Sequence, residues 1–106
     1  MTSRGYEVRA TDSFAADLSE SCAYYLEHAG KRSAGRFLDE YDSFCRLAAD
    51  VPGHGAPIEG TSLRWRKVGV FIAVYDVDDE TCIVTLLRLY HVSSNWRSRA
   101  LGQNPA

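Results

Sequence analysis

Two consecutive runs of apolar residues at helical spacing constrain the fold more than any other feature of this chain. In the first run, apolar side chains recur every three or four residues: Phe14, Leu18, Cys22, Tyr25, Leu26 and Ala29. The second run begins a few residues later and repeats the pattern: Ala34, Phe37, Leu38, Tyr41, Phe44, Cys45 and Ala48. Such stripes predict two amphipathic helices. A connection of only about three residues folds them into an antiparallel hairpin.

The ends of both predicted helices carry the expected signals. Residues 11–13, Thr-Asp-Ser, offer N-cap side chains, and Gly30 suits a C-cap. The Pro-Gly pair at 52–53 ends the second helix and opens a loop, VPGHGAPIEG, over residues 51–60. After this loop the period of the apolar residues changes to two. Strands are therefore predicted over 63–67, 70–77 and 81–91, with an acidic turn at 78–80.

Residues 5–10 also alternate and predict a first strand, whose partner the pattern does not identify. The order of elements predicts an α+β domain: an N-terminal strand, an antiparallel helix hairpin and a three-stranded antiparallel meander, with the helices packed on one face of the sheet. The length suits one domain over residues 1–99. Residues 100–106, ALGQNPA, are expected to form a disordered tail.

Composition limits the classes of function. No apolar run reaches the roughly 18 residues that cross a bilayer, and the N-terminus lacks the apolar core of a secretion signal, so we expect a cytoplasmic protein with no membrane partner. Cys22, Cys45 and Cys82 are widely spaced and odd in number. They predict buried packing positions, with no disulfide framework, no metal site and no cofactor.

The net charge of −2 argues against a generally basic nucleic-acid binder. The charges are nevertheless unevenly distributed along the chain. Residues 1–60 hold six Lys/Arg against ten Asp/Glu, whereas residues 61–106 hold six against four. The excess of positive charge in the second part favours an anionic partner there.

Three stretches, in this order, resemble the RelE/ParE superfamily of bacterial toxins from type II toxin–antitoxin systems. They are YEVRATDSFAADLSE, AGRFLDEYDSFCRLAADVPGHG and LRWRKVGVFIAVYDVDDETCIVTLLRLYH. The resemblance covers roughly residues 6–97. It implies a toxin, of the plasmid-stabilisation type, that a co-expressed antitoxin neutralises by folding over its surface in a hetero-oligomer. Tyr24, Tyr25 and Tyr41 are candidates for the antitoxin-binding surface, although their helical spacing also fits a place in the core.

The superfamily has two branches with different chemistry. RelE-like toxins are mRNA interferases that cleave mRNA in the ribosomal A site without a metal, whereas ParE-like toxins inhibit DNA gyrase by binding it. For a nuclease, the resemblance implies catalytic roles for Glu59, Tyr90 and His91, because histidine exchanges protons near neutral pH. Tyr90 and His91 stand in the reverse order to the His-Tyr pair of YoeB-type nucleases.

Cations are the other requirement of a nuclease, because the phosphorane-like transition state is negatively charged. The candidates for phosphate or target binding are Arg64, Arg66, Lys67, Arg88, Trp96 and Arg97. RelE-like nucleases also carry an arginine three residues before the tyrosine of the V-Y-x-V pattern. Here that position is Ile72, in the apolar run VGVFIAVY.

The apolar residue at that position, together with the LRLYHVSSNW ending, favours a ParE-like toxin over an mRNA endonuclease. A non-toxic member that only binds its antitoxin is the third alternative. Structural roles also stay open for individual residues. His91 suits the hydrogen-bonded end of a buried strand, the two tryptophans suit packing over a sheet, and Arg64 with Arg66 suits protection of an edge strand.

Overall fold

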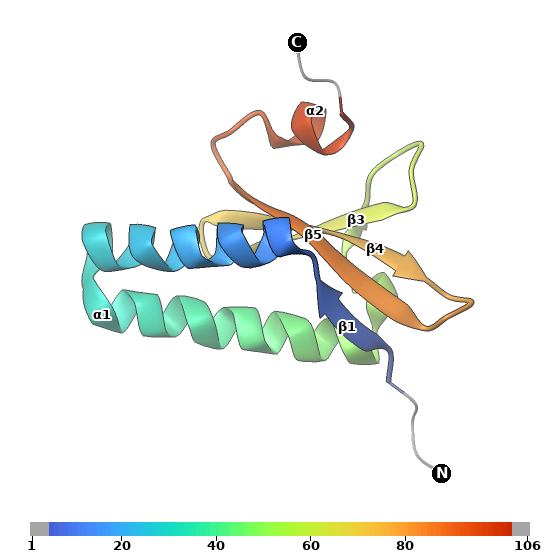
Figure 1. Ribbon diagram of the computed structural model, residues 1–106, viewed down its shortest axis with the longest axis horizontal. Helices are drawn as coiled ribbons and strands as arrows, with labels where there is room; N and C mark the ends of the chain where they lie inside the picture. Colours follow the sequence, from blue (N-terminus) through green and yellow to red (C-terminus); the bar gives the residue numbers. More distant parts are fainter. Residues whose placement is uncertain (1–4, 103–106) are drawn as a thin grey trace.

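The computed structural model describes residues 5–102 and confirms the predicted α+β class (Figure 1). In chain order, the elements are β1 (Glu7–Ala10), α1 (Asp12–Asp50), the 3-10 turn η1 (Pro52–His54), β2 (Ala56–Pro57), β3 (Leu63–Val68), β4 (Phe71–Asp78), β5 (Ile83–His91) and α2 (Trp96–Ala100). None of the described helices is long and apolar enough to cross a membrane.

The helix hairpin forms as predicted, but its connection is shorter than expected. The helix α1 is interrupted only at Gly30, whose φ of 87° and ψ of 175° are non-helical. Glycine reaches this region without a steric penalty, because it has no Cβ. A single residue therefore reverses the chain, and Figure 1 shows the two arms of α1 running antiparallel beside the sheet.

The strands form one mixed sheet with the order β1-β5-β4-β3-β2. The predicted meander of β3, β4 and β5 is antiparallel throughout. The first strand pairs with β5 in parallel, at the edge of the sheet. Two elements, β2 and α2, lie outside the prediction. They contain two and five residues, too few to produce a periodic pattern.

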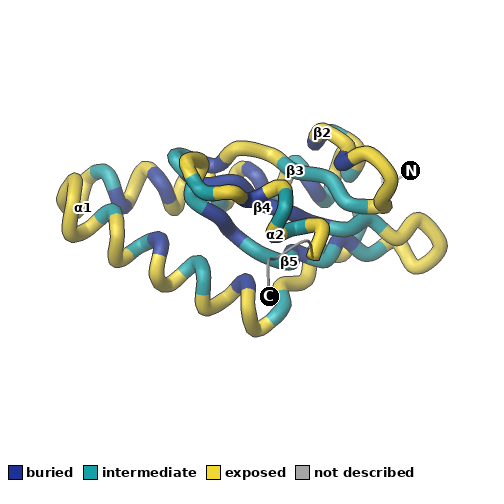
Figure 2. The backbone as a smooth tube through the Cα atoms, turned by 90° about the horizontal axis from the view of Figure 1, so that it is seen from above, coloured by how far each residue is buried: buried dark blue, intermediate teal, exposed yellow. Residues whose placement is uncertain are grey.

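Each face of the sheet carries its own apolar cluster. The main core lies between α1 and the sheet and centres on Phe14, Phe37, Tyr75, Val84 and Leu86. Figure 2 shows the buried residues gathered where α1 meets the strands and the exposed ones along its outer side. The second cluster covers the opposite face and consists of Ile58, Ile72, Val74, Tyr90 and Trp96.

Two expectations are changed at the turns and the C-terminus. Cys82 is exposed in the turn before β5, with a φ of 57°, so it is not a buried packing residue. Of the predicted tail, Ala100 is the last residue of α2, and Leu101 and Gly102 form a turn. Residues 103–106 lie outside the described part.

Candidate binding site at the end of the last strand

A β-bulge in β5 sets the geometry of the candidate site. Val74 pairs with Arg88, whereas the next residue, Tyr75, pairs with Leu86, so Leu87 is the extra residue. A bulge reverses which side of the sheet the following side chains occupy. After it, Leu89 packs in the main core and Tyr90 packs in the second cluster on the opposite face.

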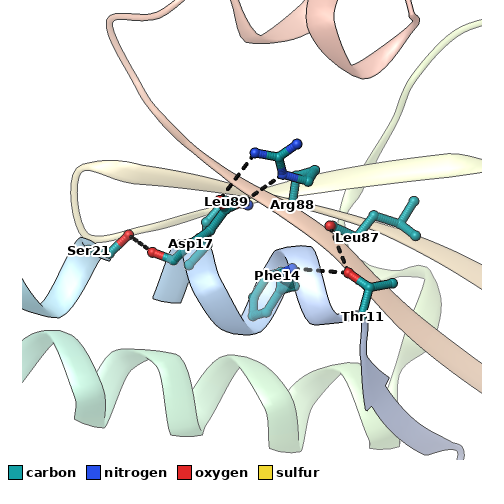
Figure 3. A network of polar contacts seen from close by, with 7 residues as sticks. All are labelled: Thr11, Phe14, Asp17, Ser21, Leu87, Arg88 and Leu89. Carbon is teal, nitrogen blue, oxygen red and sulfur yellow. Dashed lines mark hydrogen bonds and ion pairs between the residues drawn. The ribbon is translucent and has the colours of Figure 1, made fainter. Parts of the chain in front are cut away.

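Beyond the bulge, Asp17 of α1 joins the helix to the strand edge (Figure 3). Its Oδ2 accepts hydrogen bonds from Arg88 Nε at 2.6 Å and from the backbone N–H of Leu89 at 3.0 Å. Its Oδ1 accepts from Arg88 Nη2 at 3.2 Å. The carboxylate of Asp17 raises the pKa of the Arg88 guanidinium, so that guanidinium stays charged. Arg88 is therefore committed largely to an intramolecular contact.

Thr11 makes a second connection to the same edge. Its side-chain oxygen accepts a hydrogen bond from the backbone N–H of Phe14 at 3.0 Å, which caps the first helical turn. The same hydroxyl donates to the carbonyl of Leu87 at 3.1 Å. The start of α1 is thereby held against β5, and the polar groups that the bulge exposes find partners.

A hollow of about 330 Å³ lies next to these contacts. The first arm of α1 forms one wall, the end of β5 forms the floor, and α2 contributes Arg99. The lining residues are Asp17, Glu20, Ser21, Tyr24, Phe71, Arg88, Leu89, Tyr90, His91, Ser94 and Arg99. The structure thus brings together Tyr24, Arg88, Tyr90 and His91 of the predicted site residues.

His91 is held by the turn that follows β5. Its Nδ1 accepts a hydrogen bond from the backbone N–H of Ser93 at 3.1 Å and lies 2.8 Å from the Ser93 hydroxyl. A neutral ring with its proton on Nε2 fits both contacts. The ring also lies 5.5 Å, centroid to centroid, from those of Tyr24 and Phe71. In this tautomer, Nδ1 is the nitrogen without a proton. Its contacts with Ser93 leave it unavailable to take a proton from a substrate.

Aromatic and cationic side chains stack on the opposite face. Trp96 is buried and its ring centroid lies 5.1 Å from that of Trp65. The Arg97 guanidinium sits over both rings, 4.7 Å from Trp96 and 5.3 Å from Trp65. Arg99 lies in the same way over Tyr90, at 5.2 Å. These contacts are cation–π interactions, which anchor α2 on the sheet.

The remaining predicted site residues lie elsewhere. Arg64 donates from Nη1 to the carbonyl oxygens of Gly53 and Gly55, at 3.1 and 2.7 Å, and so holds the loop around η1. Arg66 and Lys67 are exposed on β3 and border a separate hollow beside α1. Glu59 is exposed in the loop before β3.

Glu59 and His91 lie toward opposite ends of β4. Leu63, which follows the Glu59 loop, pairs with Asp76, whereas His91 pairs with Phe71. Five residues of strand correspond to about 17 Å. The arrangement does not bring the two proposed proton-transfer groups together.

The three tyrosines proposed for the antitoxin surface differ in exposure. Tyr24 is exposed and lines the hollow. Tyr25 and Tyr41 are half-buried against the main core. The Tyr25 hydroxyl accepts the backbone N–H of Val70 at 2.9 Å, and burial is the main reason why the pKa of Tyr41 is raised. Tyr25 and Tyr41 therefore occupy core positions, the alternative role that their helical spacing had left open.

Sequence reasoning missed Asp17, Ser21 and Arg99. A signal was present for the first two. Asp17 lies three residues after Phe14 and Ser21 lies four residues after Asp17, so both share the inward side of Phe14. Ser21 is only 3% exposed, and its hydroxyl donates to the Asp17 carbonyl at 2.8 Å. Nothing in the sequence shows that α2 turns Arg99 back over Tyr90. Among residues 5–102, no group of three His, Cys, Asp or Glu gathers as a metal site.

The fold is similar to those of several solved toxin–antitoxin proteins. The chromosomal ParDE system from P. aeruginosa matches with 22% identity and a TM-score of 0.70, over 86% of this chain and 100% of that one. The RelBE2 complex from Mycobacterium tuberculosis matches with 22% identity and a TM-score of 0.55, over 83% and 99% of the two chains. The RelE–RelB complex from Pyrococcus horikoshii matches with 18% identity and a TM-score of 0.55, over 85% and 98%. A search of curated proteins found no match.

These likenesses, with the order of strands and the helix hairpin, show that the chain shares its fold with these toxin–antitoxin proteins. The family model described as "ParE toxin of type II toxin-antitoxin system, parDE" matches residues 8–96. The chain therefore belongs to the ParE toxin family of type II toxin–antitoxin systems.

Proposed function

We propose that this toxin acts by binding its target, with DNA gyrase as that target, and that it does not cleave mRNA. The observation that carries the proposal is the position of Ile72. It is 2% exposed and packs with Val74, Tyr90 and Trp96 in the second cluster. A nuclease of the RelE branch places an arginine there. Without that cation, the transition state of RNA cleavage would lose several kcal/mol of stabilisation.

Two further features support binding over cleavage. Glu59 is remote from His91, as shown above, and the guanidinium of Arg88 is already engaged by Asp17. The exposed Arg97 and Arg99 of α2 and the exposed Tyr24 of α1 instead suit a protein partner, because Tyr and Arg are enriched among the residues that dominate the energetics of protein interfaces. The endonuclease alternative rests on the hollow that gathers Arg88, Tyr90 and His91.

We also propose that a cognate antitoxin neutralises the toxin in a cytoplasmic hetero-oligomer. The solved structures it resembles include toxin–antitoxin complexes. The described surface offers an exposed Tyr24 beside the hollow, as an anchor for such a partner. Residues 1–99 would act as a single toxin domain.

The test is inducible expression in bacteria, with and without the product of the neighbouring open reading frame. We expect growth arrest that the neighbour relieves, and equal arrest by the His91→Ala variant. Loss of arrest in His91→Ala, with folding and antitoxin binding intact, would favour the endonuclease. Binding of the neighbour without any growth arrest would support the non-toxic alternative.

A further inference from the structure

The edge of β5 changes character at its bulge. Parallel pairing with β1 ends at Leu86, whose carbonyl accepts the N–H of Thr11. Further on, the N–H of Val92 points back to the carbonyl of Val70, which precedes β4. Main-chain groups alternate along a strand, so the N–H and C=O groups of Leu89 and His91 point away from β4. They point toward the edge of β5 along which β1 pairs with residues 83–86.

Only part of this outer edge is occupied. Asp17 takes the N–H of Leu89, and the His91 carbonyl accepts the N–H of Ser94. The carbonyl of Leu89 and the N–H of His91 have no strand beside them within residues 5–102, because β1 ends at Ala10. Leu89 and His91 both line the hollow between α1 and α2.

This free pair has the geometry of a parallel bridge. In a parallel ladder, one residue of the new strand donates to residue j of the old strand and accepts from residue j+2. Glu7 of β1 makes the first of these bonds here, donating its N–H to the carbonyl of Cys82. A peptide residue that donates its N–H to the Leu89 carbonyl and accepts the His91 N–H with its own carbonyl would repeat this pattern further along β5. Antiparallel addition at Leu89 is blocked, because Asp17 already holds its N–H.

The register also sets the side on which that residue's side chain lies. A residue that bridges Leu89 and His91 stands beside Tyr90, just as Glu7 stands beside Ile83. Its side chain therefore points to the face of Tyr90, where the guanidinium of Arg99 lies. No carboxylate of the described residues forms an ion pair with Arg99. The flanking side chains would face Tyr24 on the α1 side.

We propose that this slot binds an extended segment of the antitoxin as a short parallel strand, with an acidic side chain beside Tyr90 paired with Arg99. The inference rests on the proposed neutralisation by an antitoxin and adds the position and chemistry of one contact. Two free main-chain groups match a peptide backbone, which carries a donor and an acceptor on each residue.

The test is an NMR titration of the ¹⁵N-labelled protein with the acetylated, amidated peptide Ser-Val-Glu-Val-Ser. Versions with Gln or Lys in the centre complete the series. We expect binding at millimolar concentration, with shifts concentrated at the His91 amide and the Arg99 side chain. The Glu peptide should bind about threefold more tightly than the Gln peptide, as for a solvent-exposed ion pair, and the Lys peptide should bind most weakly.

Arg99→Gln should remove the preference for Glu over Gln, whereas Arg36→Gln should keep it. Arg36 is a matched control because it is exposed on the second arm of α1, away from the slot, where its Nη2 donates only to Ser33. Equal binding of the three peptides, or no shift at His91, would overturn the proposal. The proposed function would still stand if the antitoxin relieved growth arrest in the expression test. If the antitoxin did not relieve it, the proposed function would be contradicted independently of the peptide result.

Discussion

Replacing Asp17 by alanine tests whether the carboxylate holds the first arm of α1 on the edge of β5. The substitution leaves the N–H of Leu89, a residue only 6% exposed, without its acceptor. An unsatisfied buried backbone donor costs about 1–3 kcal/mol. The ion pair with Arg88 adds little, about 0.5 kcal/mol, because the Arg88 side chain is 42% exposed and screened by solvent.

We therefore expect Asp17→Ala to lower the free energy of unfolding by about 2 kcal/mol. For a domain of this size, that corresponds to a fall in Tm of about 10 °C. Asp17→Asn should cost about half as much, because its amide oxygen can still accept the N–H of Leu89. Urea denaturation followed by circular dichroism measures the first quantity, and a thermal scan measures the second.

The matched control is Asp42→Ala, which removes an Asp–Arg pair on the exposed surface of α1. Asp42 pairs with Arg46, and their side chains are 67% and 70% exposed. Such a pair contributes no more than about 0.5 kcal/mol. Equal destabilisation by Asp17→Ala and Asp42→Ala would refute the structural role assigned to Asp17.

Three further predictions concern the backbone and pH. Gly30→Ala should destabilise the protein by about 1–3 kcal/mol, because the φ and ψ of Gly30 suit only glycine. Its control is Gly35→Ala, where the added methyl group meets open space on a helix. This substitution should stabilise the protein by about 1 kcal/mol in the same urea assay. Cys82→Gly should raise the free energy of unfolding by about 0.5 kcal/mol, since relief of its positive φ exceeds the added chain entropy; a decrease would contradict this. Burial lowers the pKa of His54, whose ring stacks on Tyr75, so its contribution to stability is complete above about pH 6.5 and is lost as pH falls through the lowered pKa. His54→Phe should therefore lose less stability than the wild type between about pH 7 and pH 5, and identical slopes would contradict the assignment.

The sequence predicted the features that depend on local periodicity. The apolar stripe through Phe37 and Phe44 required a helix whatever its neighbours, and the alternation along β3 to β5 required strands. The single-residue reversal at Gly30 was within one turn of the predicted connection.

The remaining features depend on contacts between distant residues. Whether residues 7–10 join β5 or another strand depends on where the hairpin returns the chain, which no local pattern encodes. The bulge at Leu87 arises from the fit between β4 and β5, and it decides that Leu89 and Tyr90 face opposite sides. The partners of Asp17 could not be predicted either, because its carboxylate contacts Arg88 and Leu89, which lie 71 and 72 residues further along the chain.

The most direct test of the central claim compares two activities of the purified toxin. DNA supercoiling by gyrase and ribosome-dependent cleavage of mRNA are measured over the same range of toxin concentration, with and without antitoxin. If the toxin acts by binding gyrase, we expect inhibition of supercoiling that the antitoxin reverses, with the mRNA left intact. Cleaved mRNA with unaffected supercoiling would contradict it.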